Sequence, residues 1–144
     1  WATAILPAGF GGDFAYLTAL NRGLAESRHT MFRTNFCLTP AQLAFLVGSG
    51  LNVVLFVASD NHAVVQLNGE TLLNEPAYTD HEMSYWNSEV SVPSSVLVSG
   101  TNTLAAAVYN SYGSSDAAFD SDLRIVNGPD LSALLSYSSS GCSE

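Results

Sequence analysis

The chain has 144 residues, of which 47% are hydrophobic, and this combination suits one domain with a buried core and excludes a disordered chain. Its formal net charge is −9 and its only cations are four arginines, so the phosphates of nucleic acids and of anionic membranes are excluded as partners. Only 12% of the residues are charged, and a polar surface built from Ser, Thr, Asn and Gly suggests a secreted, extracellular or cell-surface protein, or one packed among copies of itself.

The first segment, residues 1–29, is predicted to be an apolar arm followed by a short helix. Residues 1–12 (WATAILPAGFGG) are apolar and end in glycines, which favours an extended arm over a regular element. Asp13 could cap a helix that runs to Glu26, because apolar residues follow it near helical spacing. Gly23 weakens that helix.

A strand followed by a helix is predicted next. Residues 30–38 read as a strand in which Phe32, Thr34 and Phe36 face one way. The sequence Thr39-Pro40-Ala41-Gln42 has the form of a capping box with proline at the first helical position, so we expect one short helix up to Gly48.

The uncharged stretch Ala41–Ala58 is almost long enough to span a bilayer. Gly48-Ser49-Gly50 and Asn52 interrupt it, and an alternating, β-branched pattern begins only after them. Two elements joined by a turn therefore explain it better than a membrane helix, and we expect no membrane insertion.

Three apolar runs, at 51–58, 63–67 and 70–73, are predicted to form an antiparallel meander. Asn68-Gly69 separates the second run from the third, and this dipeptide favours a type I′ hairpin turn because both positions need positive φ. Ser59-Asp60-Asn61-His62 makes the other reversal. We expect Asp60 and Asn61 to bond the local backbone there rather than to contact a ligand.

Beyond a polar loop at 74–89, the pattern predicts three further strands and one helical turn. Many short strands with little helix indicate an all-β antiparallel sandwich spanning residues 30–126. The tail 127–144 is expected to pack on the sandwich or on a neighbouring molecule. The strands are 90–92, 102–110 and 122–126, and the helical turn lies in 93–100.

The two cysteines, Cys37 and Cys142, lie far apart and have no metal-type spacing. One long-range disulfide is favoured over two buried free thiols. The three histidines are scattered, and we interpret them as surface residues.

Three stretches together resemble galactose-binding-like jelly-roll domains: FRTNF at Phe32–Phe36, VLFVASDNHAVVQLNG at 54–69 and VPSSVLVSGTNTLAAAVYN at 92–110. The resemblance covers residues 30–126 and implies a jelly-roll β-sandwich with one or two short helical turns. Such domains occur as accessory modules of glycoside hydrolases and in many secreted or surface proteins. The family often has two acidic residues at the turn where this chain has Asp60-Asn61.

Asp116, Asp120 and Asp122 form a D-x-x-x-D-x-D pattern in an expected loop. Hard oxygen ligands at this spacing could hold a structural calcium ion, which modules of the resembled type often carry. The alternative is that Phe119 and the apolar residues after it already lead into a strand. No other cofactor is expected.

The 74–89 loop carries aromatic rings beside polar groups. Rings that stack on sugar C–H faces, with carboxylate and amide groups to bond hydroxyls, would make a carbohydrate-binding platform. The same residues could instead cover the end of the sandwich or anchor a subunit interface. The candidates are Tyr78, Asp80, His81, Tyr85 and Trp86.

No catalytic motif is recognisable, and no pair of carboxylates stands out for glycosidic chemistry, so we expect a non-enzyme. The composition favours a self-assembling subunit of an extracellular fibre or matrix, whose partners are copies of itself. A carbohydrate-binding module that binds glycans is the alternative, and the apolar ends could also simply cover sheet edges of their own domain. The expected assembly residues are Trp1, Ile5, Leu6, Phe10, Leu131, Leu134 and Leu135.

Overall fold

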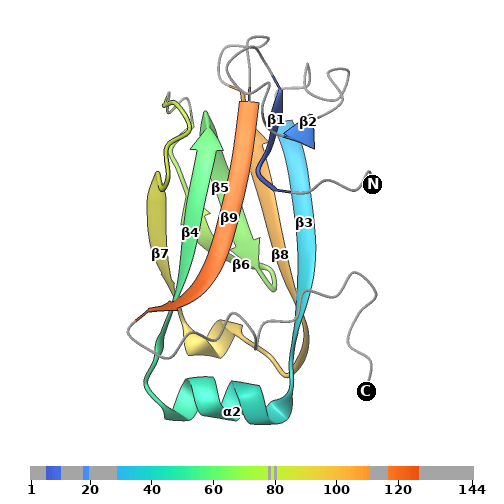
Figure 1. Cartoon of the computed structure of the whole chain (residues 1–144), viewed down its shortest axis with the longest axis vertical. Helices are drawn as coiled ribbons and strands as arrows, with labels where there is room; N and C mark the ends of the chain where they lie inside the picture. Colours follow the sequence, from blue (N-terminus) through green and yellow to red (C-terminus); the bar gives the residue numbers. More distant parts are fainter. Residues whose placement is uncertain are drawn as a thin grey trace.

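The computed structural model describes residues 6–10, 18–19, 29–77, 79, 81–110 and 117–126. Two layers of strands run along the long axis, and one helix lies across one end (Figure 1). The elements are β1 (Ala8–Phe10), β2 (Thr18–Ala19), β3 (His29–Leu38), α2 (Pro40–Gly48), β4 (Asn52–Asp60), β5 (His62–Leu67), β6 (Glu70–Asn74), β7 (Ser88–Val92), the 3₁₀ turn η1 (Ser94–Val96), β8 (Gly100–Tyr109) and β9 (Ala117–Val126).

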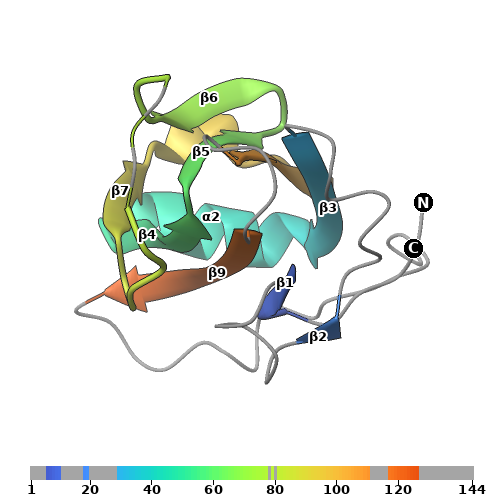
Figure 2. The same cartoon turned by 90° about the horizontal axis from the view of Figure 1, so that it is seen from above.

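One layer is a five-stranded sheet in the order β2-β1-β9-β4-β7, and the other is a four-stranded sheet in the order β3-β8-β5-β6. Figure 2 shows the two layers facing each other, with α2 beneath them. Every pair in the described part is antiparallel except β1 with β2. Among the described strands, consecutive ones stay in the same layer only from β1 to β2 and from β5 to β6, and every other connection takes the chain to the opposite layer. The expected all-β jelly-roll sandwich, with its two short helical segments, is confirmed.

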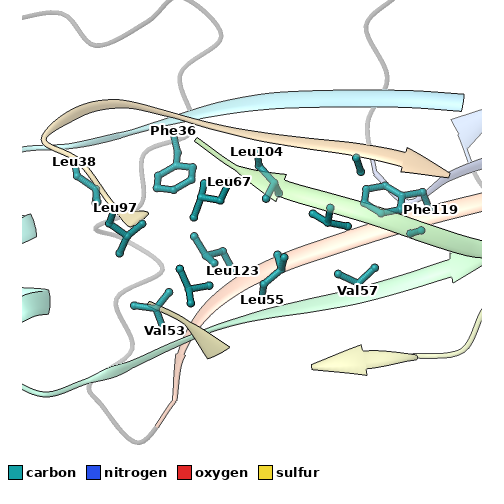
Figure 3. Close-up of a cluster of buried hydrophobic side chains, with 14 of the residues drawn as sticks. Phe36, Leu38, Val53, Leu55, Val57, Leu67, Leu97, Leu104, Phe119 and Leu123 are labelled. Atoms are coloured by element: carbon teal, nitrogen blue, oxygen red, sulfur yellow. The ribbon is translucent and has the colours of Figure 1, made fainter. Parts of the chain in front are cut away.

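Alternate residues of the strands fill the space between the sheets. On β3 the residues with even numbers point inward, as predicted, so Phe36 and Leu38 are buried. Burying one such side chain contributes about 1.5–3 kcal/mol, and the core contains sixteen buried residues, so it is the main source of stability. Figure 3 shows part of this core, with Phe36, Leu38, Val53, Leu55, Val57, Leu67, Leu97, Leu104, Phe119 and Leu123 labelled.

The helix α2 begins with the predicted capping box. The Gln42 backbone N–H donates to Thr39 Oγ1 (3.2 Å), and the Thr39 N–H donates to Gln42 Oε1 (2.7 Å). Since β4 begins four residues after the helix ends, Ala41–Ala58 is two elements, as predicted. Within the described residues, no helix combines the length and apolarity needed to cross a bilayer.

The Asn68-Gly69 hairpin is also confirmed, with φ of 52° and 85° at its two central residues. Asn68 Nδ2 donates to Asn102 Oδ1 (2.8 Å) and to the Val96 carbonyl (2.8 Å). Asn102 is fully buried and its Nδ2 donates to the carbonyls of Val98 (2.8 Å) and Gly100 (3.1 Å). These two asparagines therefore join the hairpin to the turn that precedes β8.

The predicted three-stranded meander is wrong. β4 pairs with β7 and β9, whereas β5 pairs with β6 and β8, so the reversal at 59–62 carries the chain from one sheet to the other. The physical reason is that β7 and β9 pair along the two edges of β4, so no edge of this buried strand is left for β5. Asn61 N–H donates to the Tyr109 carbonyl (3.2 Å), so the turn is fixed to β8.

The N-terminal segment forms strands. Ala8–Phe10 is extended, as predicted for the arm, but it is a regular strand that pairs with Ala117–Phe119 of the same chain. The helix predicted for 13–26 is wrong at Thr18–Ala19, because these residues pair in parallel with β1; the rest of that stretch lies outside the described residues.

Other predicted assembly and disulfide residues are only partly described. Leu6 is partly buried and packs against the core. Cys37 is not a free thiol, but Cys142 lies outside the described residues, so their pairing stays a prediction. The residues Trp1, Ile5, Leu131, Leu134 and Leu135 also lie outside the described part.

Candidate functional site

The outer face of the five-stranded sheet carries charged residues around an apolar centre. Since Leu55 and Val57 of β4 point into the core, Phe56 points outward. The strand register places Phe56 opposite Glu89 of β7 on one side and opposite Asp122 of β9 on the other. Residues directly opposite each other in antiparallel strands have Cβ atoms about 5 Å apart, so these side chains are neighbours.

The connection between β6 and β7 covers this apolar centre with a stack of rings. Trp86 packs on Phe56, with ring centroids 5.9 Å apart, and Tyr85 meets Trp86 edge-on at 4.9 Å. Phe56 is only 9% exposed, whereas Tyr85 is 57% exposed. Trp86 is thus the supporting layer, and Tyr85 presents its ring to solvent.

Arg124 of β9 is held against the same rings. Its guanidinium lies 4.7 Å from the centroid of Phe56 and 5.3 Å from that of Trp86. Its Nε donates to Asp122 Oδ2 at 2.7 Å. The combination of a cation–π contact and a charge-assisted hydrogen bond restricts the orientation of the guanidinium.

Asp120 of β9 lies beside the exposed ring. Burial raises the pKa of its carboxyl; hydrogen bonds from the Ser121 N–H (2.8 Å) and from the Tyr85 hydroxyl lower this pKa in part, and the nearby Asp122 raises it. The Tyr85 hydroxyl is therefore bonded to a carboxylate. We call this group of residues the aromatic face: Phe56, Tyr85, Trp86, Glu89, Asp120, Asp122 and Arg124.

A single amide holds the β6–β7 connection against β4. Asn87 Oδ1 accepts hydrogen bonds from the Ser59 N–H (3.0 Å) and the Ser84 N–H (3.0 Å). Asn87 Nδ2 donates to the Glu82 carbonyl (3.0 Å). The turn that carries Tyr85 and Trp86 is thus closed on itself and fixed to the strand beneath it.

A second polar cluster anchors the start of the same connection. Glu75 Oε2 accepts a hydrogen bond from the Ala63 N–H (2.6 Å), and its Oε1 accepts one from Ser88 Oγ (3.0 Å). His81 Nε2 lies 3.5 Å from Glu75 Oε2. Glu75 therefore bridges β5, β7 and the connection. The sequence did not predict this role, and its one indication is the position of Glu75 directly after β6.

His62 and His29 flank Tyr109 in the other sheet. The His62 ring, on β5, stacks on Tyr109 with a centroid distance of 4.6 Å and an angle of 5°. The His29 ring, on β3 at the other side of β8, has its centroid 4.4 Å from that of Tyr109. Burial lowers the pKa of His62. A hydrogen bond with the Thr79 backbone and the charge of Glu75 raise this pKa in part, and the charges of His81 and His29 lower it further. His62 is buried, so its interpretation as a surface residue is wrong; pairing between strands distant in sequence encloses it.

The predicted sugar-contacting residues divide between these clusters. Tyr85 and Trp86 lie on the aromatic face, as the platform hypothesis requires. His81 turns instead toward Glu75, while Tyr78 and Asp80 lie outside the described residues. Phe56, Glu89 and Arg124 were missed, because only the strand register brings them to the loop.

Two of the three predicted calcium ligands, Asp120 and Asp122, lie on a strand. β9 begins at Ala117, so the loop expected up to residue 121 is wrong, and the apolar residues 117–119 are buried strand residues. Asp120 and Asp122 are two positions apart on one face, about 7 Å along the strand, and Arg124 engages Asp122. This arrangement fits a calcium ion poorly, and Asp116 lies outside the described residues. The described part of the chain contains no group of three or more side chains that could hold a metal ion.

No protein-family model matches the chain, and no curated protein matches it. The resemblance to galactose-binding-like domains therefore stays a prediction.

Proposed function

We propose that this domain is a non-catalytic carbohydrate-binding module of a secreted or cell-surface protein, and that Tyr85 is its stacking platform. The observation that carries the proposal is the exposure of Tyr85. At 57% it is the most exposed of the large hydrophobic side chains in the described part of the chain, and it rests on a packed layer of Trp86 and Phe56. A ring held in this way can stack on the C–H face of a sugar without first being ordered.

Polar groups around the ring suit the hydroxyls of a sugar. Asp120 and Glu89 offer carboxylate acceptors, and Arg124 offers guanidinium donors. Binding sites for small polar ligands usually combine aromatic surface with a few fixed polar groups that set the orientation. The Arg124 guanidinium, held by its contacts with Phe56 and Asp122, and the Asp120 carboxylate, held by the Tyr85 hydroxyl, are such groups.

A glycan array with the intact protein, followed by calorimetry on the best ligand, tests this function. Tyr85→Ala should weaken binding about tenfold or more, because it removes the stacking surface. The matched control is Phe45→Ala, since Phe45 is also an exposed aromatic residue (47%) but lies on α2, at the opposite end from the β6–β7 connection (Figure 1). Unchanged binding by Tyr85→Ala, or the absence of any glycan ligand, would overturn the proposal.

Self-assembly is the second candidate, and the pairing of β1 favours it. β1 belongs to the apolar arm and joins β9 through only three residue pairs. The arm of another copy could form the same hydrogen bonds, so exchange of this strand would link copies at little cost in bonding. Light scattering should then show discrete oligomers that grow with concentration and are lost when residues 1–12 are removed, whereas the β9 edge opened by this removal would give only non-specific aggregates. A full chain that stays monomeric at high concentration would exclude this candidate.

A further inference from the structure

We propose that the aromatic face selects sugars that carry free, protonated amines, such as polymers of glucosamine, over neutral and acidic glycans. This inference rests on the carbohydrate-binding function proposed above and names its ligand class. It follows from three observations: the balance of charge on the face, the position of Asp120 at the Tyr85 ring, and the overall charge of the chain.

The balance of charge on the aromatic face is negative. Three carboxylates, those of Asp120, Asp122 and Glu89, stand against one guanidinium. That guanidinium is already bonded to Asp122 at 2.7 Å. Neither Asp120 nor Glu89 forms an ion pair within the described residues, so two carboxylates on this face are left to attract a cation.

The Tyr85 ring and Asp120 offer an amino sugar two contacts at once. The electron-rich face of a tyrosine attracts a cation placed over it as well as the C–H bonds of a sugar ring. Because the Tyr85 hydroxyl donates to Asp120, a carboxylate lies at the edge of the ring. A pyranose stacked on Tyr85 can therefore bring an ammonium substituent to this carboxylate, an interaction that a neutral or N-acetylated sugar lacks.

Charge also separates the proposed ligand from its alternatives. Acidic glycans would be repelled by Asp120 and Glu89 and by a chain whose net charge is −9. A lysine side chain can also place its methylenes on the ring and its ammonium at Asp120, but it covers less of the Tyr85 ring than a pyranose does. The structure thus favours an amino sugar over a basic peptide.

Calorimetry can compare the binding of glucosamine oligomers, fully N-acetylated oligomers of the same length and polylysine. All three are measured at one pH that keeps the amines protonated and the Asp120 carboxyl ionised. The intact protein should bind the free amine form about fivefold or more tightly than the acetylated form, and added salt should reduce this difference. Asp120→Asn and Glu89→Gln should each remove much of the preference. Glu70→Gln is the matched control, because Glu70 is an exposed carboxylate on β6 of the other sheet.

The outcomes distinguish this inference from the function beneath it. Equal binding of the two oligomers, with a loss in Tyr85→Ala, would overturn the amine preference and keep the carbohydrate-binding function. Polylysine binding as tight as that of the glucosamine oligomer would show a general cation site and overturn the inference. Thermal melting of each variant establishes that it is folded, and Glu89→Gln changes an exposed side chain, so it tests the charge even if Asp120→Asn does not fold.

Discussion

The two ends of the sandwich are stabilised by different kinds of polar group. At the helix end, near α2, the capping box and the Asn68–Asn102 pair are neutral, and they bond backbone groups. At the loop end, near the β6–β7 connection, the side chains that hold the segments together include titratable groups such as Glu75 and His62. The Ser59 hydroxyl there is buried without a hydrogen-bond partner in the described part of the chain. The helix end therefore has a structural role, and the loop end is the part that pH or a ligand can change.

Asn102→Ala tests the helix end and should have the largest effect. It removes a fully buried amide with two donated and two accepted hydrogen bonds, and it leaves the groups around Val98 without partners. We expect the free energy of unfolding to fall by about 3 kcal/mol. Chemical denaturation measures it, and the exposed Asn74→Ala is the control. A loss no larger than that of the control would contradict the role given to this network.

Glu75→Ala tests the loop end and should have an intermediate effect. Loss of the hydrogen bonds from the Ala63 N–H and from Ser88 Oγ should lower the free energy of unfolding by about 2 kcal/mol. Hydrogen exchange should increase mainly in the β6–β7 connection. Glu82→Ala, an exposed carboxylate in the same connection, serves for comparison. Uniform destabilisation of both ends would show that they are not independent.

The smallest effect is expected from the protonation of His62. Its pKa in the folded state is below the ordinary 6.5, so between these two values the unfolded chain binds more protons. Stability should therefore rise with pH through this window and fall as the pH drops below 6.5. His62→Gln should reduce this slope in denaturation curves recorded across the window. An unchanged slope would show that His62 does not make the loop end sensitive to acid.

Elements that depend on neighbouring residues could be predicted from the sequence. The capping box at Thr39, the Asn68-Gly69 turn and the inward side of β3 all follow local rules and are confirmed. The pairing of β4 could not be predicted from the turn residues at 59–62. The same residue types suit a hairpin to the next strand and a crossing to the other sheet. The actual partners, β7 and β9, follow β4 by about 30 and 60 residues, and no local turn signal identifies them.

The candidate site divides in the same way. Tyr85 and Trp86 are neighbours in sequence, so their loop could be recognised as an aromatic platform. Phe56 and Arg124 join them only through the pairing of β4 with β9. One signal was present in β9, where Asp120, Asp122 and Arg124 occupy every second position between Phe119 and Ile125 and so indicate a strand with one charged face.

The pairing of β1 with β9 has a practical consequence for anyone who produces this protein. The β9 residues that β1 covers, Ala117–Phe119, are almost completely buried. A shortened version that starts at residue 30, where the resemblance begins, would leave their backbone groups open at a sheet edge. Unprotected edges promote aggregation. Preparations should therefore retain the residues from Leu6 onward, because the folding unit extends further toward the N-terminus than the sequence resemblance suggests.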